Sequence, residues 1–185
     1  GNYAAGANLN IALLDERLNF ALAYLRAYQG AGSGYDLAGF AGTDAATDPF
    51  DDRANSANNY GLASSFYVFL KLAVGVYAGY TTATTIDDNA YADIFNWSAY
   101  ATYVDLLKEG STFIVSFGQP PTLVGSGGNA VADDPDTPYL LNVEYQYSFN
   151  DFIQLTPGGY ALFNPNGDSD NSTIYVGTLR TIFRF

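Results

Sequence analysis

Hydrophobic and polar residues alternate along much of the chain, which predicts strands with one apolar face and one polar face. The clearest case is segment 139–149. One face carries Tyr139, Leu141, Val143, Tyr145, Tyr147 and Phe149, and the other carries Leu140, Asn142, Glu144, Gln146 and Ser148. This segment of eleven residues is longer than most strands of soluble sheets. It matches the roughly 9–11 residues with which a tilted strand crosses a bilayer.

The last eight residues show the same alternation. One face carries Leu179, Thr181, Phe183 and Phe185, and the other carries Thr178, Arg180, Ile182 and Arg184. An apolar face, an Arg-bearing face and a final aromatic residue are typical of the last strand of an outer-membrane β-barrel. In such a barrel the apolar face meets lipid and the charged face meets water. A half-buried strand of a soluble sheet explains this segment alone equally well.

The whole chain divides into segments of strand length, and none has a helical period with caps at both ends. We predict nine strands, at 2–13, 18–28, 57–69, 73–86, 91–105, 111–122, 138–149, 152–163 and 173–185. Short connections at 14–17, 70–72, 106–110 and 150–151 alternate with longer ones at 29–56, 87–90, 123–137 and 164–172. This alternation fits the periplasmic and external ends of a bacterial barrel. The predicted fold is all-β, an antiparallel transmembrane β-barrel, with residues 1–185 forming one domain.

Composition narrows the function. With 19 acidic and 7 basic residues, the chain lacks the basic clusters that nucleic-acid binding requires. It has no cysteine and no histidine, so thiolate metal sites and the commonest general base are absent. Only 14% of residues are charged, against about 25% in ordinary soluble domains. We expect no cofactor, no nucleic-acid partner and no covalent chemistry.

The acidic residues favour one set of connections. The longer connections, with Asp93 at the edge of one, hold 13 of the 19 acids: Asp36, Asp44, Asp48, Asp51, Asp52, Asp87, Asp88, Asp93, Asp133, Asp134, Asp136, Asp168 and Asp170. They hold one basic residue, Arg53. One rim of the barrel is therefore expected to be negative and to attract cations within a Debye length of about 8–10 Å. A general preference of Asp for loops explains the loop placement but not the choice of loops.

Several stretches resemble cyanobacterial outer-membrane porins of the OprB-like, carbohydrate-selective group, often labelled iron-uptake porins. They are 134–139 leading into 143–147, Asn164-Pro165 followed by 171–180, 94–97 through 107–110, and more weakly 57–62. The likeness covers most of the chain from about residue 57. It is most specific in the last fifty residues.

This resemblance implies a 16-stranded barrel, usually a homotrimer, preceded by a surface-layer homology segment. Nine strands would be the C-terminal part of such a barrel, and the inward-folded constriction loop would lie upstream. The resemblance further implies a place in the outer membrane, in contact with the lipid bilayer. It implies passive diffusion of small hydrophilic solutes, which would be inorganic ions, iron species or sugars.

Candidate functional residues follow from the alternation. Polar side chains expected to line the pore are Asn96, Asn142, Glu144, Gln146, Arg180 and Arg184. Aromatic side chains expected to face lipid are Tyr139, Tyr145, Tyr147, Phe149, Phe183 and Phe185. Glu144 is positioned to pair with an arginine, and such wall residues are often just paired or solvated. Asp168 and Asp170 are weak candidates for a hard cation, because they supply oxygen ligands without the EF-hand pattern; the favoured expectation is no metal site.

Two other function classes remain open on the sequence alone. An enzyme could use two loop carboxylates for glycoside hydrolysis, but no pair stands out among the loop acids. A soluble β-sandwich that binds carbohydrate through tyrosines would need a second layer packed against residues such as Tyr145, Tyr147 and Phe183. A porin would leave those side chains facing lipid.

Overall fold

The computed structural model describes residues 1–150 and 152–184. In these residues nine strands pair in chain order in one antiparallel sheet. The strands are β1 (Tyr3–Leu13), β2 (Leu18–Gln29), β3 (Asn55–Phe69), β4 (Leu72–Thr85), β5 (Tyr91–Val104), β6 (Thr112–Gly127), β7 (Tyr139–Ser148), β8 (Ile153–Phe163) and β9 (Ile174–Phe183). Short helical turns are η1 (Gly39–Ala41), α1 (Asp44–Thr47) and η2 (Pro165–Gly167). The predicted all-β fold is confirmed, and the strand ends mostly agree within a few residues.

Strand β6 is the main difference from the sequence expectation. It was expected to end at residue 122, but it continues to Gly127. Its pairing with β7 stops at Gly118, and its pairing with β5 shifts register near Phe95 and Trp97. Pro120 and Pro121 lie in this stretch, where one edge of β6 has no strand partner. Proline lacks an N–H and is tolerated at such bulges and free edges.

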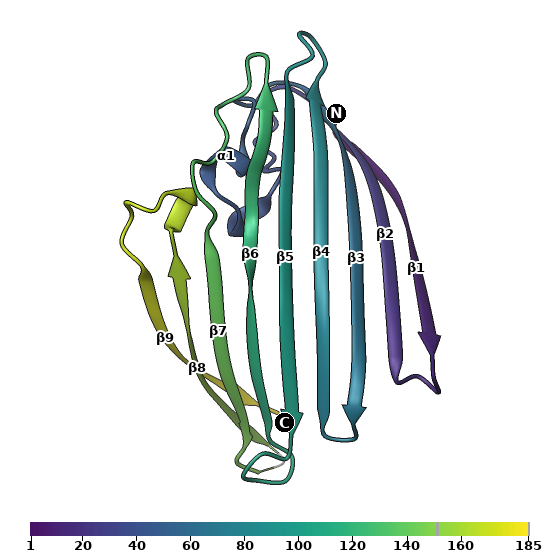
Figure 1. Ribbon diagram of the computed structural model, residues 1–185, viewed down its shortest axis with the longest axis vertical. Coiled ribbons are helices and arrows are strands. Elements are labelled where there is room, and N and C mark those ends of the chain that lie inside the picture. The colour runs from purple at the N-terminus through teal and green to yellow at the C-terminus, as the bar shows by residue number, and fades with distance from the viewer. Residues whose placement is uncertain (151, 185) are drawn as a thin grey trace.

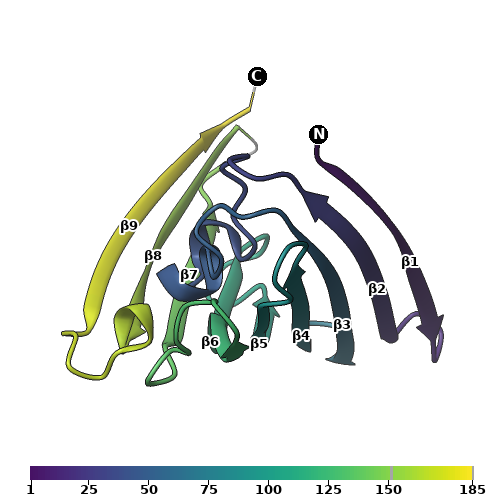
Figure 2. The same cartoon turned by 90° about the horizontal axis from the view of Figure 1, so that it is seen from above.

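The sheet curves into an open arch (Figure 2). All longer connections lie at one end, and all short turns lie at the other (Figure 1). The N-terminus lies at the long-loop end and the C-terminus at the short-turn end (Figure 1). In the described part of the chain, no helix is long and apolar enough to cross a membrane.

One apolar cluster and the strand register identify the residues that face the inside of the arch. Ala57, Ala83, Ala92 and Ile94 pack against the β2–β3 loop, which lies on the concave side (Figure 2). Because side chains alternate between the faces of a strand, the pairing register then assigns each remaining strand residue to the concave or the convex face. The two faces of segment 139–149 are those the sequence predicts, with Asn142, paired to Ser116, on the concave side.

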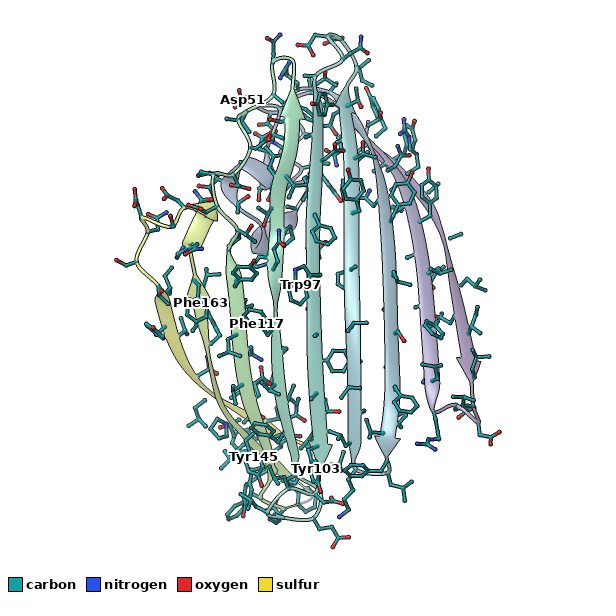
Figure 3. All side chains as sticks on the ribbon, in the orientation of Figure 1. Asp51, Trp97, Tyr103, Phe117, Tyr145 and Phe163 are labelled. Atoms are coloured by element: carbon teal, nitrogen blue, oxygen red, sulfur yellow. The ribbon has the colours of Figure 1, made fainter. Side chains whose placement is uncertain are left out.

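Aromatic side chains form two belts on the convex face. The upper belt comprises Tyr24, Tyr60, Tyr80, Trp97, Phe117, Tyr139 and Phe163, and the lower belt comprises Phe66, Tyr103, Phe113, Tyr145, Tyr147 and Phe183. Figure 3 shows Trp97, Phe117 and Phe163 at similar height, with Tyr103 and Tyr145 near the short turns. Neighbouring rings touch across strands, with centroids 5.9 Å apart for Trp97–Phe117 and 5.6 Å apart for Phe117–Tyr139.

The convex surface between the two belts is apolar. It carries mainly Leu9, Ile11, Leu22, Leu62, Val76, Ala99, Ala101, Val115, Leu141, Val143 and Leu179. Tyr139 and Tyr145 are six residues apart, or about 20 Å along a strand. Membrane barrels have an apolar band of about 25 Å between two aromatic girdles. We therefore expect the belts to lie at the two interfaces of a bilayer.

Charged residues on the convex face lie outside this band. Arg26 and Asp93 face outward, but each lies beyond the upper belt, toward the long-loop end. Arg26 donates a hydrogen bond to Ser56 Oγ at 2.9 Å. Among the described residues, no Asp, Glu, Lys or Arg faces outward between the belts. Both outward charges can therefore remain in water above the lipid.

No second layer covers the convex face within the residues described. Leu179 and Phe183 are 71% and 61% exposed. Tyr145 donates a hydrogen bond to Leu106 O of the neighbouring turn, and Lys108 Nζ of the same turn lies over the Tyr147 ring. The single sheet of the described residues therefore gives no support to the alternative of a soluble β-sandwich.

The two faces of β7 generate a matched test. Arginine in place of Val143 should destabilise the folded barrel in lipid vesicles by about 2–4 kcal/mol, because the charge enters the middle of the hydrocarbon band. Arginine in place of the adjacent Asn142 should cost much less, because that side chain faces the interior. Urea-unfolding midpoints of the two variants in the same vesicles measure the difference, and equal losses would contradict the assignment of faces.

Candidate functional site

The concave face carries all six polar residues expected to line a pore. Asn96 on β5 lies over Gly79 of β4, while Asn142, Glu144 and Gln146 follow one another along β7. Arg180 of β9 lies on the same face, opposite Thr156 of β8. Arg184 follows β9 and donates from Nη2 to Gln154 Oε1 at 3.1 Å. Their role in conduction stays a prediction.

Glu144 and Arg180 form an ion pair across the intervening strand β8. Arg180 Nη2 lies 3.7 Å from Glu144 Oε2. The Glu144 side chain reaches over Gly158, where an added Cβ would come within 3.0 Å of Glu144 Cγ. The Arg180 side chain is 58% exposed and the Glu144 side chain is 30% exposed. Pairs of this kind contribute at most about 1 kcal/mol to the stability of the fold. The pair therefore sets local charge on the wall more than it stabilises the sheet.

The β2–β3 connection folds into the arch. Residues 30–54 leave the top of β2, cross the concave side with α1 facing β6 to β8, and return to β3 (Figures 1 and 2). The chain therefore carries an inward-folded loop of its own. That the constriction loop lies upstream, as the family resemblance implies, stays a prediction.

The end of this loop next to β3 is anchored by an apolar plug and an ion pair. Phe50 is 1% exposed and packs among Ala57, Ala83 and Leu123. Arg53 Nη1 lies 2.7 Å from Asp88 Oδ2 in the β4–β5 loop, and Arg53 Nη2 donates to Asn129 O. Hydrogen bonds, chiefly from the Thr85 hydroxyl and then from the Asn129 amide, hold the pKa of Asp88 well below its usual range.

The α1 part of the loop is fastened to the β6–β7 and β8–β9 loops. Thr43 caps α1 by accepting from Ala46 N at 3.1 Å, and its hydroxyl donates to Asp134 Oδ2 at 2.6 Å. Asp44 N donates to Asn166 Oδ1 at 2.7 Å, and Asn166 Nδ2 donates back to Asp44 Oδ2 at 3.1 Å. Three connections of the long-loop end thus meet at α1.

Asp134 is the charged centre of this contact. Burial raises the pKa of its carboxyl, and the nearby charges of Asp133 and Asp44 add to the rise. Hydrogen bonds from Thr43 and from the Leu123 amide, at 2.7 Å, act in the opposite direction. The carboxyl is therefore held in place by donors in a setting that otherwise disfavours its charge.

A groove of about 650 Å³ lies between the loop and the wall formed by β1 to β5. Leu37, Ala38 and Pro121 bound it on the loop side. The wall contributes Asn8, Asn59, Tyr77, Thr81, Ile94 and Asn96. None of the lining residues in the described part of the chain carries a charge.

The floor of the groove is built from small residues. Asn8 pairs with Ala23, which continues across the sheet through Gly61 and Gly79 to Asn96. An added Cβ on Gly79 would lie 2.6 Å from the Tyr77 hydroxyl and closer still to Asn96 Oδ1. The side chains of Tyr77 and Asn96 therefore occupy the space above Gly79, and any larger residue at position 79 would displace them.

The acidic clusters of the rim are used for turn formation. Asp168 Oδ1 accepts from Asp170 N at 2.8 Å, and Asp136 Oδ2 accepts from Ser169 N at 3.0 Å. The Ser169 hydrogen bonds lower the pKa of Asp136. Within the described residues, no group of three or more acidic side chains is arranged to hold a metal ion.

The aromatic residues expected to face lipid lie on the convex side where they are described. Tyr139 belongs to the upper belt, Tyr145, Tyr147 and Phe183 belong to the lower belt, and Phe149 follows the end of β7 and is 58% exposed. Phe185 lies outside the described residues. That these side chains contact lipid stays a prediction.

Comparison with known proteins agrees with this geometry. The family described as carbohydrate-selective porin, OprB family, matches residues 1–185. The chain belongs to this family. An uncharacterized protein of Nostoc sp. (strain PCC 7120) is 32% identical over 192 residues, and one of Synechocystis sp. (strain PCC 6803) is 28% identical over 204 residues. No solved structure matches the chain.

The OprB family places the protein in the outer membrane, in agreement with the two aromatic belts. Each alignment covers 100% of this chain, but 32% of the Nostoc protein and 37% of the Synechocystis protein. The chain therefore spans about a third of the length of these relatives.

Sequence reasoning missed the inward loop and the groove. The β2–β3 connection is the longest in the chain, and it contains a Thr43–Asp44 helix start and the apolar pair Pro49–Phe50. A long loop with its own cap and apolar plug is a signal of a folded loop. The groove offered no such signal, because its lining residues come from six strands and a loop.

The arginines of the concave face give a prediction for the whole pore. Changing Arg180 and Arg184 to glutamate should shift the reversal potential in a salt gradient toward cation preference, because wall charges set weak ion selectivity. Arg26→Glu is the control, since it makes the same type of substitution once, on the convex face. An unchanged reversal potential in the double variant would place both side chains outside the conducting path.

Proposed function

We propose that the whole protein is a porin through which small hydrophilic solutes diffuse passively across the outer membrane, with no catalytic step. The observation that carries the proposal is the division of one sheet into two faces. The convex face has a charge-free band between aromatic belts, while the concave face has a polar wall and a groove. A polar interior inside a lipid-exposed barrel is the arrangement of water-filled porins.

We further propose that this chain is one part of a larger barrel. An odd number of antiparallel strands leaves β1 and β9 running in the same direction, so these two edges cannot pair with each other in antiparallel fashion. Unpaired edges are not tolerated in lipid. Closure with an even number of strands requires an odd number of additional ones. Seven more would complete the 16-stranded barrel implied by the family resemblance, and a homotrimer would follow the same resemblance.

The groove favours neutral solutes. Its lining offers the amides of Asn8, Asn59 and Asn96 and the hydroxyls of Tyr77 and Thr81, without a charge. Amides and hydroxyls both donate and accept hydrogen bonds, as sugar hydroxyls require. This supports sugars as the solute class, in line with the family's description.

Inorganic cations, including iron species, are the second candidate. The acidic residues of the long-loop end support them, because a negative rim concentrates cations at the mouth. Arg53, the one basic residue of these loops, is already paired with Asp88. A rim of this kind would also act on charged solutes more strongly at low ionic strength.

The solute classes can be separated with the purified whole protein. Liposomes containing it should swell in isotonic solutions of neutral mono- and disaccharides, because the residues that line the groove carry no charge. Planar bilayers should show an ion conductance with only weak selectivity. Swelling no faster than in protein-free liposomes, together with conductance for cations, would contradict the sugar proposal and favour the cation candidate.

A further inference from the structure

The hydrogen bonds of the α1 part of the β2–β3 loop to the rest of the chain lie on one side. They run to Pro121 O, Asp134 and Asn166. On the other side the α1 part faces the groove, and no hydrogen bond joins residues 36–48 to β1–β4 in the part of the chain that the structure describes. The position of this segment therefore sets how far the groove is open.

We propose that Asp134 is a positioning residue that holds the α1 segment and thereby fixes the width of the groove. This inference rests on the proposed function as a pore. Asp134 is not a lining residue of the groove, and it would act through Thr43, the cap of α1. Its effect would appear in the size limit of the pore.

One oxygen of Asp134 makes the connection. Oδ2 accepts from the Thr43 hydroxyl at 2.6 Å and from Leu123 N at 2.7 Å, while Asp134 N donates to Leu123 O at 3.1 Å. Asp134 is thus tied to β6 through its backbone and side chain, and it presents the same oxygen to the loop. Gly167 closes the other side, since an added Cβ there would lie 2.6 Å from Asp134 Oδ1.

Thr43 transmits the contact into the loop. Its side chain is nearly buried, at 3% exposure, and it links the first turn of α1 to Asp134. Its backbone N–H donates to Pro121 O at 3.0 Å. Loss of the side-chain contact would leave the capping residue of α1 without its charged partner, while Phe50 and Arg53 would still hold the end of the loop next to β3. The loop tip would move while the barrel stayed assembled.

Substitutions at Asp134 can distinguish the effect of its hydrogen bonds from the effect of its negative charge. Both hydrogen bonds to its side chain use one acceptor oxygen, so the carbonyl oxygen of asparagine can replace it. Asp134→Asn should therefore keep the wild-type size limit. Asp134→Ala should give a noisier open current and should admit larger sugars. Asp136→Ala is the matched control, because Asp136 lies in the same loop but accepts from Ser169, not from the β2–β3 loop.

The experiment uses the whole protein in planar bilayers and in liposomes with neutral sugars of increasing size. A shift of the size limit in Asp134→Ala, with Asp134→Asn and Asp136→Ala unchanged, supports the inference. An unchanged limit in Asp134→Ala overturns it, and so does an equal shift in Asp134→Asn, which would mean that charge is decisive. A wild-type protein that does not conduct would instead refute the proposed function.

A second pair of variants covers a failure of Asp134→Ala to assemble. Thr43→Val removes the same hydroxyl from the loop side and should shift the size limit, while Thr43→Ser should keep it. This chain has no cysteine, so Asp44→Cys with Asn166→Cys can replace the lost contact in the Thr43→Val pore. Oxidation should restore the narrower limit and reduction should release it; a pore indifferent to both treatments would overturn the inference.

Discussion

A lipid bilayer offers no hydrogen bonds to the backbone, and this constraint governs the structure. Every N–H and C=O of a membrane strand must pair with a neighbouring strand. The side chains of each strand are then divided between two solvents, because they alternate between the faces. Residues Val143 and Asn142 are neighbours in sequence and lie on opposite sides of that division.

The division explains features that would be faults in a soluble protein. Phe183 and Leu179 are exposed to an extent that water would penalise, but hydrocarbon does not. Arg26 and Asp93 face outward only beyond the upper aromatic belt. The few buried apolar side chains gather around Phe50, where the loop meets the sheet. The core of this molecule therefore stabilises a loop, not a second layer.

Much of the fold could be predicted from alternation alone. Segment 139–149 has the faces that its sequence indicates, because strand period and burial agree there. Strand β6 was predicted to end at residue 122, whereas it continues to Gly127 along an edge that has lost its β7 partner. Local sequence does not reveal which strand edge is free.

The candidate site was predictable only in part. The pairing of Glu144 with Arg180 follows from two polar faces, and the structure brings them together. The contact of Thr43 with Asp134 joins residues 91 positions apart, and nothing near either residue indicates the other. Glycines such as Gly79 act by the space they leave for Tyr77 and Asn96, which is a property of two strands and not of one.

The most direct test of the two-solvent division is a cysteine scan along β7. Single cysteines from residue 139 to residue 148 of the whole protein, spin-labelled in lipid vesicles, would be tested for collision with oxygen and with a water-soluble nickel complex. The account predicts oxygen access at Leu141, Val143 and Tyr145 and nickel access at Asn142, Glu144 and Gln146, with a period of two residues. Nickel access that does not alternate along this strand would contradict it.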